Sequence, residues 1–233
     1  MTAVDGRRTR WDTHRAERRA QVVEAALEVL REVGPEFGVE EVAERAGITK
    51  PVIYRHFTDR AGLVQAMGEW ATANLLDDWV LPVIHTADAP RTRIRGAITA
   101  FLGFLEQNPN VYWLFVRHAP ADGSDVAQAN KDLIGAAVAG VLHDFLAIGD
   151  ADPRTADVWA HGLVGFVQNT AEWWLEHRTL TRDELADHLT TLVWAQMDGI
   201  VRSYGITLDP DRPITPEDLA EHARSRGLLP RGS

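Results

Sequence analysis

The stretch AGITKPVIYRHFTDR, residues 46 to 60, predicts a tight turn followed by a short helix. Gly47 can take the positive φ that such a turn needs, and Thr49 can cap the helix that follows. Pro51 fits the first turn of that helix because the amide it lacks would have no partner within the helix. We therefore expect a helix that begins near Thr49.

Residues 39 to 46 predict a second short helix, which ends at Gly47. Two helices that cross through a short turn need a small residue at their contact, and Ala43 supplies it. They also need apolar residues that face a third helix, and these are Val39, Val42, Ala46, Ile48 and Ile53. The spacing predicts a helix-turn-helix, although the same pattern occurs in helical hairpins that do not bind DNA.

The helix after the turn has a basic and aromatic face. With Val52 and Ile53 directed to the core or its edge, the exposed residues are Lys50, Pro51, Tyr54, Arg55 and His56. Arginine can bond two acceptors of guanine at once, tyrosine can reach a phosphate, and proline or threonine methyl groups can contact thymine. This face favours DNA binding over the simple hairpin.

A wider pattern of fixed spacing runs through this region, carried by Ala46, Gly47, Ile48, Thr49, Tyr54, His56, Phe57, Arg60 and Leu63. With it, the segment from about Arg18 to Met67 resembles the DNA-binding region of the TetR family of transcriptional repressors. The resemblance implies that Thr49, Lys50, Pro51 and Arg55 face bases or nearby phosphates. It also implies that Tyr54, His56 and Arg60 contact the DNA backbone, and that Phe57 is a core residue.

One position departs from the family pattern. The family often has Thr-Ser or Thr-Thr before the first helix of the motif, where this chain has Phe37 and Gly38. We expect a missing phosphate contact there and a slightly weaker helix cap.

The rest of the chain predicts an all-α fold. Apolar residues recur at three and four spacing, without a sustained alternating stretch. We expect helices near 14–33, from 59 towards 82, and near 91–107, 110–118, 124–148, 153–177 and 181–204, with a short one from 215. Residues 1–60 are expected to form a DNA-binding domain with a flexible basic arm, and residues 61–233 a helical ligand-binding and dimerisation domain. Residues 228–233, LLPRGS, are similar to a protease-cleavage remnant of an expression tag.

The net charge is distributed unequally between the first 60 residues and the rest of the chain. Residues 1–60 hold 11 basic and 11 acidic residues, so the rest carries the whole net charge of −10. A nucleic-acid contact is therefore expected at the N-terminal end. The chain has no Cys and no apolar stretch long enough to span a bilayer, so we expect a cytoplasmic protein without disulfides or a membrane anchor.

Aromatic residues in the larger part favour a ligand pocket, in which we predict Phe104, Trp113, Trp159, Phe166, Asn169 and Trp173. Large aromatics at helical spacing can equally be simple core. The resemblance implies a small hydrophobic or aromatic effector and a homodimer paired through the last two long helices. Residues suited to that pairing are Gly162, Gly165, Leu189, Leu192, Val193 and Met197.

The alternative is a helical metal- or ligand-dependent enzyme without DNA binding. The chain has nine His, but it lacks the paired Glu-x-x-His motifs of a di-iron bundle and the common hydrolase and nucleotide-binding motifs. We therefore predict no catalytic or metal-ligating residues and no cofactor. The predicted function is a ligand-responsive regulator, a repressor that binds a palindromic DNA operator as a dimer.

Overall fold

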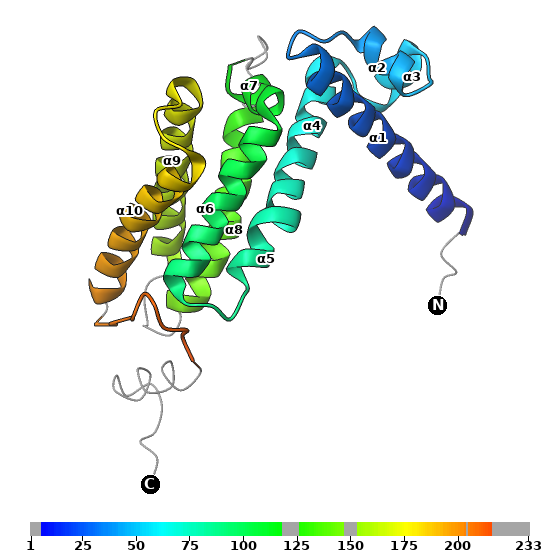
Figure 1. The fold of residues 1–233 in the computed structure, drawn as a ribbon. Coiled ribbons are helices and arrows are strands. Elements are labelled where there is room, and N and C mark those ends of the chain that lie inside the picture. Colours follow the sequence, from blue (N-terminus) through cyan, green and yellow to red (C-terminus); the bar gives the residue numbers. More distant parts are fainter. Residues whose placement is uncertain (1–5, 118–125, 147–152, 204, 216–233) are drawn as a thin grey trace. The chain divides into compact units, whose positions relative to one another are not determined.

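The computed structural model describes residues 6–117, 126–146, 153–203 and 205–215, and every regular element in these ranges is a helix (Figure 1). The all-α prediction is confirmed. The elements are α1 (Gly6–Val33), α2 (Val39–Arg45), α3 (Lys50–His56), α4 (Arg60–Asn74), η1 (Leu75–Val80), α5 (Leu81–Ile84), α6 (Pro90–Gln107), α7 (Pro109–Arg117), α8 (Val126–Leu146), α9 (Pro153–His177) and α10 (Arg182–Ser203). The helix predicted from residue 215 lies outside the described residues. None of the described helices has the length and apolar character needed to cross a membrane.

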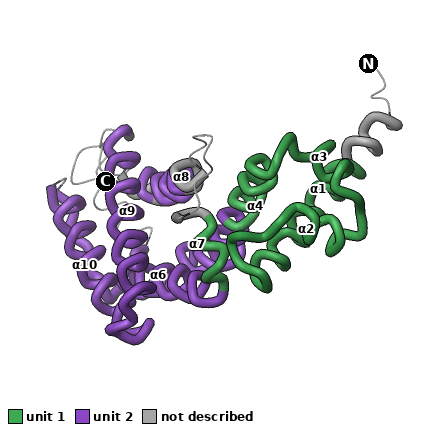
Figure 2. Tube along the Cα trace, turned by 90° about the horizontal axis from the view of Figure 1, so that it is seen from above, with its two compact units in different colours: residues 1–71, 108–128 green, residues 72–107, 129–233 purple. Residues whose placement is uncertain are grey.

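The chain divides into two compact units, coloured separately in Figure 2. Unit 1 comprises residues 1–71 and 108–128, and unit 2 comprises residues 72–107 and 129–233. Unit 1 thus continues past the predicted boundary at residue 60 and includes α7. The side-chain amide of Asn110 helps to hold α7 in unit 1, because it donates hydrogen bonds to the carbonyls of Leu30 (3.1 Å) and Arg31 (3.2 Å) at the end of α1. Carbonyls in the last turn of a helix lack helical amide donors, and here the Leu30 carbonyl also accepts a hydrogen bond from the Gly34 amide at 3.0 Å.

The first helix begins earlier than predicted, at Gly6 instead of near residue 14. Residues 7–33 contain neither Gly nor Pro and are rich in Arg, Ala and Glu, which all favour helix. One face of α1 carries an apolar stripe that is buried, and its members are Val22, Val23, Ala26, Leu27 and Leu30. Gly34, with φ of +96°, ends the helix.

Pro82 does not stop the long helical run that starts at Arg60. The chain passes from α4 through a π-helical turn, η1, in which the Leu81 amide donates to the carbonyl of Leu76. Pro82 then lies in the first turn of α5, where its missing amide is not needed. A single π turn inside an α-helix is a recognised device that often accompanies a functional site.

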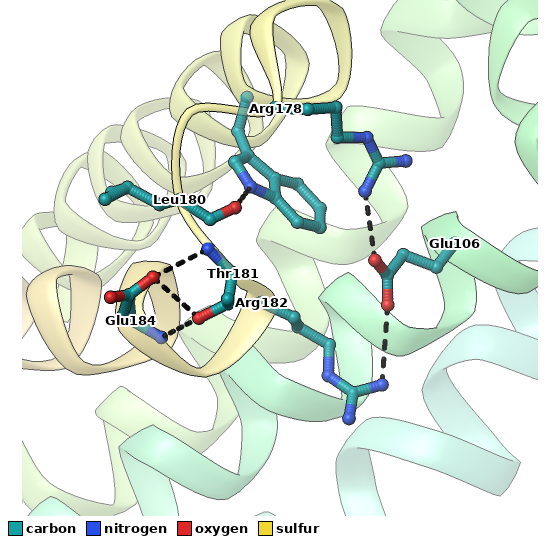
Figure 3. A network of polar contacts seen from close by, with 7 residues as sticks. Glu106, Arg178, Leu180, Thr181, Arg182 and Glu184 are labelled. Atoms are coloured by element: carbon teal, nitrogen blue, oxygen red, sulfur yellow. Dashed lines mark hydrogen bonds and ion pairs between the residues drawn. The ribbon is translucent and has the colours of Figure 1, made fainter.

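In unit 2, α6 packs against η1, α5 and α10. The α9–α10 turn is fixed to the end of α6 by a polar network (Figure 3). Glu106 accepts hydrogen bonds from Arg178 (2.9 Å) and Arg182 (3.5 Å). The buried Trp174 ring donates its Nε1–H to the Leu180 carbonyl at 2.7 Å.

The network continues into the capping box of α10. The Thr181 amide donates to Glu184 (2.8 Å), and the Glu184 amide donates to the Thr181 hydroxyl (3.3 Å). The Thr181 amide and the Thr181 hydroxyl both donate to the Glu184 carboxylate, and these two hydrogen bonds hold the pKa of that carboxyl below its usual value. The turn is therefore a rigid end of unit 2.

Candidate DNA-binding surface and effector cavity

The turn before α3 has the predicted geometry. Gly47 has φ of +64°, a conformation that side-chain-bearing residues rarely adopt. The Ile48 amide donates to the Ala43 carbonyl at 3.0 Å, which closes the turn. Ile53 and Phe57 are buried, with 0% and 3% of their surface exposed, and they fix the back of α3 to unit 1. The orientation of α3 is thus set by its core-facing side.

The opposite side of α3 is open. Thr49, Pro51, Tyr54 and Arg55 are exposed, and Tyr54 is 40% exposed despite its large ring. Thr49 occupies the capping position, but its hydroxyl makes no capping hydrogen bond. The backbone carbonyl of Thr49, not its hydroxyl, accepts the first hydrogen bonds of α3. The hydroxyl is therefore available to a partner such as a phosphate.

Lys50 is held in place by two neighbours. Its ammonium forms an ion pair with Glu40 of α2 and lies 5.9 Å from the centre of the Tyr54 ring. This hydrogen-bonded pair raises the pKa of Lys50 and lowers the pKa of Glu40. DNA would have to compete with the Glu40 carboxylate for this cation.

Arg60 lies at the start of α4, as predicted, and is also engaged. It donates to the Pro35 carbonyl at 2.9 Å, and its guanidinium lies 4.9 Å from the centre of the Phe37 ring. The first turn of α4 is capped by Asp59, which accepts a hydrogen bond from the Gly62 amide at 2.8 Å. Arg60 thus links the loop after α1 to the start of α4.

His56 is surrounded by cations. Burial lowers its pKa, and the charges of Arg55, Arg15, Arg18 and Arg19 lower it further. Its Nδ1 is buried and has no hydrogen-bond partner among the described residues. Burial and the nearby cations thus both favour the uncharged imidazole, and the arginines near it come from α1 and α3.

The expected weakness at Gly38 is offset locally. The Glu41 carboxylate accepts a hydrogen bond from the Gly38 amide at 2.6 Å and so satisfies one of the free amides at the start of α2. Residue 38 has no hydroxyl, so it cannot make the phosphate contact that the family often makes here.

Unit 2 contains an apolar cavity of about 230 Å³. Its walls come from η1, α5, α6, α8, α9, α10 and the segment after α10. The lining residues of α6 and α9 are Pro90, Arg93, Ile94, Ala97, Ile98, Phe101, Trp159, Leu163, Val164, Val167 and Gln168. Such a wall suits an apolar ligand with few polar groups.

Of the six residues predicted for the pocket, Trp159 lines this cavity. Phe104 is buried with its ring 6.0 Å from that of Trp79, and Phe166 is half-buried. Asn169 and Trp173 are exposed on α9, and the Trp173 ring stacks on His177. Trp113 belongs to unit 1, where it packs against Tyr112.

Two polar residues of the cavity wall are not among the predicted set. Arg93 is partly buried, which lowers its pKa, while the charge of Asp88 acts in the opposite direction. The Oε1 atom of Gln168 is buried without a hydrogen-bond partner among the described residues. The sequence could have indicated Gln168, because it shows this amide side chain at the end of an apolar helical run.

Both parts of the chain match known families. Residues 22–67 match the family model of bacterial regulatory proteins of the tetR family, and residues 82–203 match that of the tetracyclin repressor-like C-terminal domain. The second match covers more than half of the chain. No group of three or more His, Asp or Glu in the described residues is placed to hold a metal ion.

Relatives of similar length are transcriptional regulators. An uncharacterized HTH-type transcriptional regulator of Mycobacterium tuberculosis (strain H37Rv) is 28% identical over 203 residues, which cover 87% of this chain and 86% of the relative. The HTH-type transcriptional activator FasR of Mycolicibacterium smegmatis is 29% identical over 188 residues, or 80% and 85% of the two chains.

Solved structures share the fold. A tetR-family transcriptional regulator from Streptomyces coelicolor superposes with a TM-score of 0.64 at 23% identity, covering 92% of this chain and 99% of the other. The transcriptional regulator FadR from Bacillus subtilis, in complex with stearoyl-CoA, has a TM-score of 0.55 at 15% identity, covering 75% and 96%. The chain belongs to the TetR family of transcriptional regulators, and it is a regulator, not an enzyme.

Proposed function

We propose that this regulator binds a palindromic operator as a homodimer through α3 and that a small apolar effector in the cavity of unit 2 changes its affinity for DNA. The observation that carries the proposal is the open basic face of α3, backed by the buried anchors Ile53 and Phe57. We infer repression, because a dimer bound over a promoter blocks polymerase. In vitro transcription from the bound promoter, with and without the protein, tests it: a rise in transcript would instead show an activator.

The proposed contacts fall into two groups. We propose that α3 enters the major groove and that four residues of α3 and its cap read bases or adjacent phosphates, namely Thr49, Lys50, Pro51 and Arg55. Tyr54, His56 and Arg60 are proposed to contact the DNA backbone. Because its environment favours the uncharged imidazole, His56 is not a fixed cation, and Arg15, Arg18 and Arg19 add charge beside it.

A face on α9 and α10 is proposed as the dimer interface. On α9 the exposed residues Val158, Gly162, Gly165, Asn169 and Trp173 recur every three or four positions, and they therefore lie on one side of the helix. Val158 is 69% exposed, and on α10, the next helix along the chain, Leu192 is 50% exposed. We propose that these exposed large apolar residues belong to an interaction surface.

The residues predicted for dimerisation separate into two sets. Three of them are exposed and remain in the proposed interface: Gly162, Gly165 and Leu192. Leu189 and Val193 are buried within the protomer, and Met197 lines the cavity. These three are placed to support the fold and the cavity wall instead of a partner.

The effector is proposed to bias the geometry of the dimer. A ligand that binds better to one conformation of the protein shifts the population towards it, and coupling of about 1 to 3 kcal/mol between two sites is typical. In the FadR structure the bound molecule is stearoyl-CoA. That neighbour supports an apolar ligand in this fold, and the lining of the cavity supports it independently.

Operator binding is expected to depend strongly on salt. If each protomer makes about four cationic phosphate contacts, the slope of log K against log salt should be about −7 for the dimer. Fluorescence anisotropy of a labelled operator between about 50 and 200 mM salt measures this slope. A slope near zero would contradict the electrostatic role of the α1 and α3 surface.

Glu40→Gln is expected to strengthen DNA binding several-fold. The substitution removes the carboxylate that holds Lys50 and leaves the ammonium free for a phosphate or a base. Exposed ion pairs are typically worth about 0.2–1 kcal/mol, which sets the size of the gain for each protomer, and two more free cations per dimer should make the salt slope steeper by about two.

Glu44→Gln is the matched control for this experiment. Glu44 is exposed on the same helix, and its substitution removes the same charge. If both variants gain affinity equally, the effect is one of net charge, and the proposed competition between Glu40 and DNA for Lys50 is wrong.

A further inference from the structure

His56 lies where basic side chains of α1 and α3 come together. The charges that act on its imidazole belong to four arginines, namely Arg55 of α3 and Arg15, Arg18 and Arg19 of α1. Ring contacts fix the place, since the His56 ring lies 6.4 Å from that of Phe57. The Arg19 guanidinium lies 5.1 Å from the centre of the same Phe57 ring. The imidazole therefore has positive charge near it from both helices.

Three of these four arginines have no acidic partner. From α4, the Glu69 carboxylate pairs with Arg19 at 3.8 Å. No carboxylate among the described residues forms an ion pair with the other three, Arg15, Arg18 and Arg55. Like charges placed together without counter-ions repel one another. Such a cluster suits an anion, and for a protein that binds DNA this anion is a backbone phosphate.

The imidazole of His56 can itself carry a further charge in this cluster. His56 is half-buried, and of its two ring nitrogens only Nδ1 is buried without a hydrogen-bond partner among the described residues. Nε2 is therefore the nitrogen that can meet solvent or a phosphate. Burial and the four arginines hold the pKa of His56 below its ordinary value of about 6.5. The free protein thus disfavours the protonated ring.

We propose that His56 takes up a proton from solvent when the operator binds. A DNA phosphate beside the cluster offsets the charge of the arginines, so the repulsion that disfavours the imidazolium in the free protein is removed. The Nε2–H of the imidazolium then donates a charge-assisted hydrogen bond to the phosphate. This inference rests on the proposal that α3 binds DNA, and it makes operator affinity depend on pH.

The direction of the pH dependence follows from linkage. The complex holds the proton up to a higher pH than the free protein does. The binding constant therefore falls as the pH rises through the window between the two pKa values of His56, and this contribution is constant outside the window. One proton per protomer gives a slope of log K against pH of at most about −1, or about −2 for the dimer.

The pH profile of operator binding measures this slope. Fluorescence anisotropy of a labelled operator from about pH 5.5 to 8, at constant salt, covers the range in which histidine titrates. The wild type is expected to bind more tightly as the pH falls. His56→Gln is expected to show a slope close to zero, because glutamine can still donate to a phosphate but cannot take up a proton.

His14→Gln is the matched control for this profile. His14 is exposed on α1, next to Arg15 in the sequence, and its Nδ1 lies 3.8 Å from the Glu17 carboxylate. This variant should keep the wild-type slope. A His56→Gln protein that keeps the slope, or a His14→Gln protein that loses it, would overturn the inference.

Proton uptake can also be counted with the wild-type protein alone. Calorimetry of operator binding in two buffers of different ionisation enthalpy gives the number of protons taken up, and up to about two per dimer are expected within the window. In an NMR titration, the pKa of His56 should rise when the operator is added. An unchanged or lower pKa in the complex would contradict proton uptake at this residue.

Arg15→Gln tests the origin of the effect. Removal of one neighbouring charge is expected to raise the pKa of His56 in the free protein, so the variant should take up less of a proton on binding. Arg31→Gln is the control, because Arg31 is exposed on the same helix but about 24 Å further along it, well beyond the Debye length of about 10 Å. Equal pKa shifts in the two variants would contradict a local cluster.

The proposed function and this inference fail in different ways. If the protein binds no duplex DNA, the proposed function is wrong and the inference falls with it. If the protein selects an operator but binds it equally well across the pH range, the proposed function stands and proton uptake at His56 is wrong.

Discussion

Arg55→Ala is expected to weaken specific operator binding by about 1 to 3 kcal/mol for each half-site, because a bidentate arginine–guanine contact discriminates by about that amount. Arg55 is exposed on the open face of α3, between the buried anchors Ile53 and Phe57, and its side chain can therefore be removed without disturbing the core. Since a dimer uses two copies, the loss should be about twice as large on a full operator.

A gel-shift titration with the operator and with a scrambled duplex measures this effect. Arg95→Ala serves as the control, because Arg95 lies in unit 2, where it pairs with Asp187 at 2.6 Å. If Arg55 reads a base, its loss weakens operator binding more than binding to the scrambled duplex. Equal loss on both sequences would make Arg55 a phosphate contact, and unchanged affinity would remove it from the DNA surface.

Gly165→Arg is expected to abolish the dimer and to lower operator affinity by about 10²- to 10⁴-fold, the gain that two linked binding modules typically provide. Gly165 is exposed on α9, and a Cβ atom added there would have no protein atom within 4 Å. The protomer should therefore keep its fold, and a helix favours arginine over glycine. A bulky cation would nevertheless block the close approach of a second protomer.

Light scattering measures the molecular mass, and far-ultraviolet circular dichroism checks that the helices remain. Gly140→Arg is the matched control, because Gly140 is also an exposed helical glycine with open space around it, but it lies on α8. A Gly165→Arg protein that remains a dimer, or a Gly140→Arg protein that becomes a monomer, would contradict the assignment of the α9 and α10 face.

Local geometry explains why the helix-turn-helix could be predicted from the sequence. The positive φ of Gly47 and the burial of Ile53 and Phe57 follow from short-range constraints that residue types reveal directly. The ion pair between Lys50 and Glu40 and the contact of Arg60 with Pro35 could not be predicted in the same way. Each depends on how a flexible side chain turns once separate helices have packed.

The cavity was harder to predict because helical spacing does not show which side of a helix meets a void. Trp159 and Trp173 lie on the same helix, yet Trp159 lines the cavity and Trp173 is 47% exposed. In the same way, helical spacing does not show that Leu192 is exposed while Leu189 is buried in the core. Only the packing of α9 and α10 against the rest of unit 2 assigns these sides.

Selection of binding sites from random double-stranded DNA with the purified wild-type protein tests the central claim most directly. We expect enrichment of two inverted half-sites whose centres lie about one helical turn apart, about 34 to 36 Å. The Arg55→Ala protein should fail to enrich the same sequence. Enrichment of no sequence, or of single half-sites without symmetry, would contradict a dimer that reads an operator through α3.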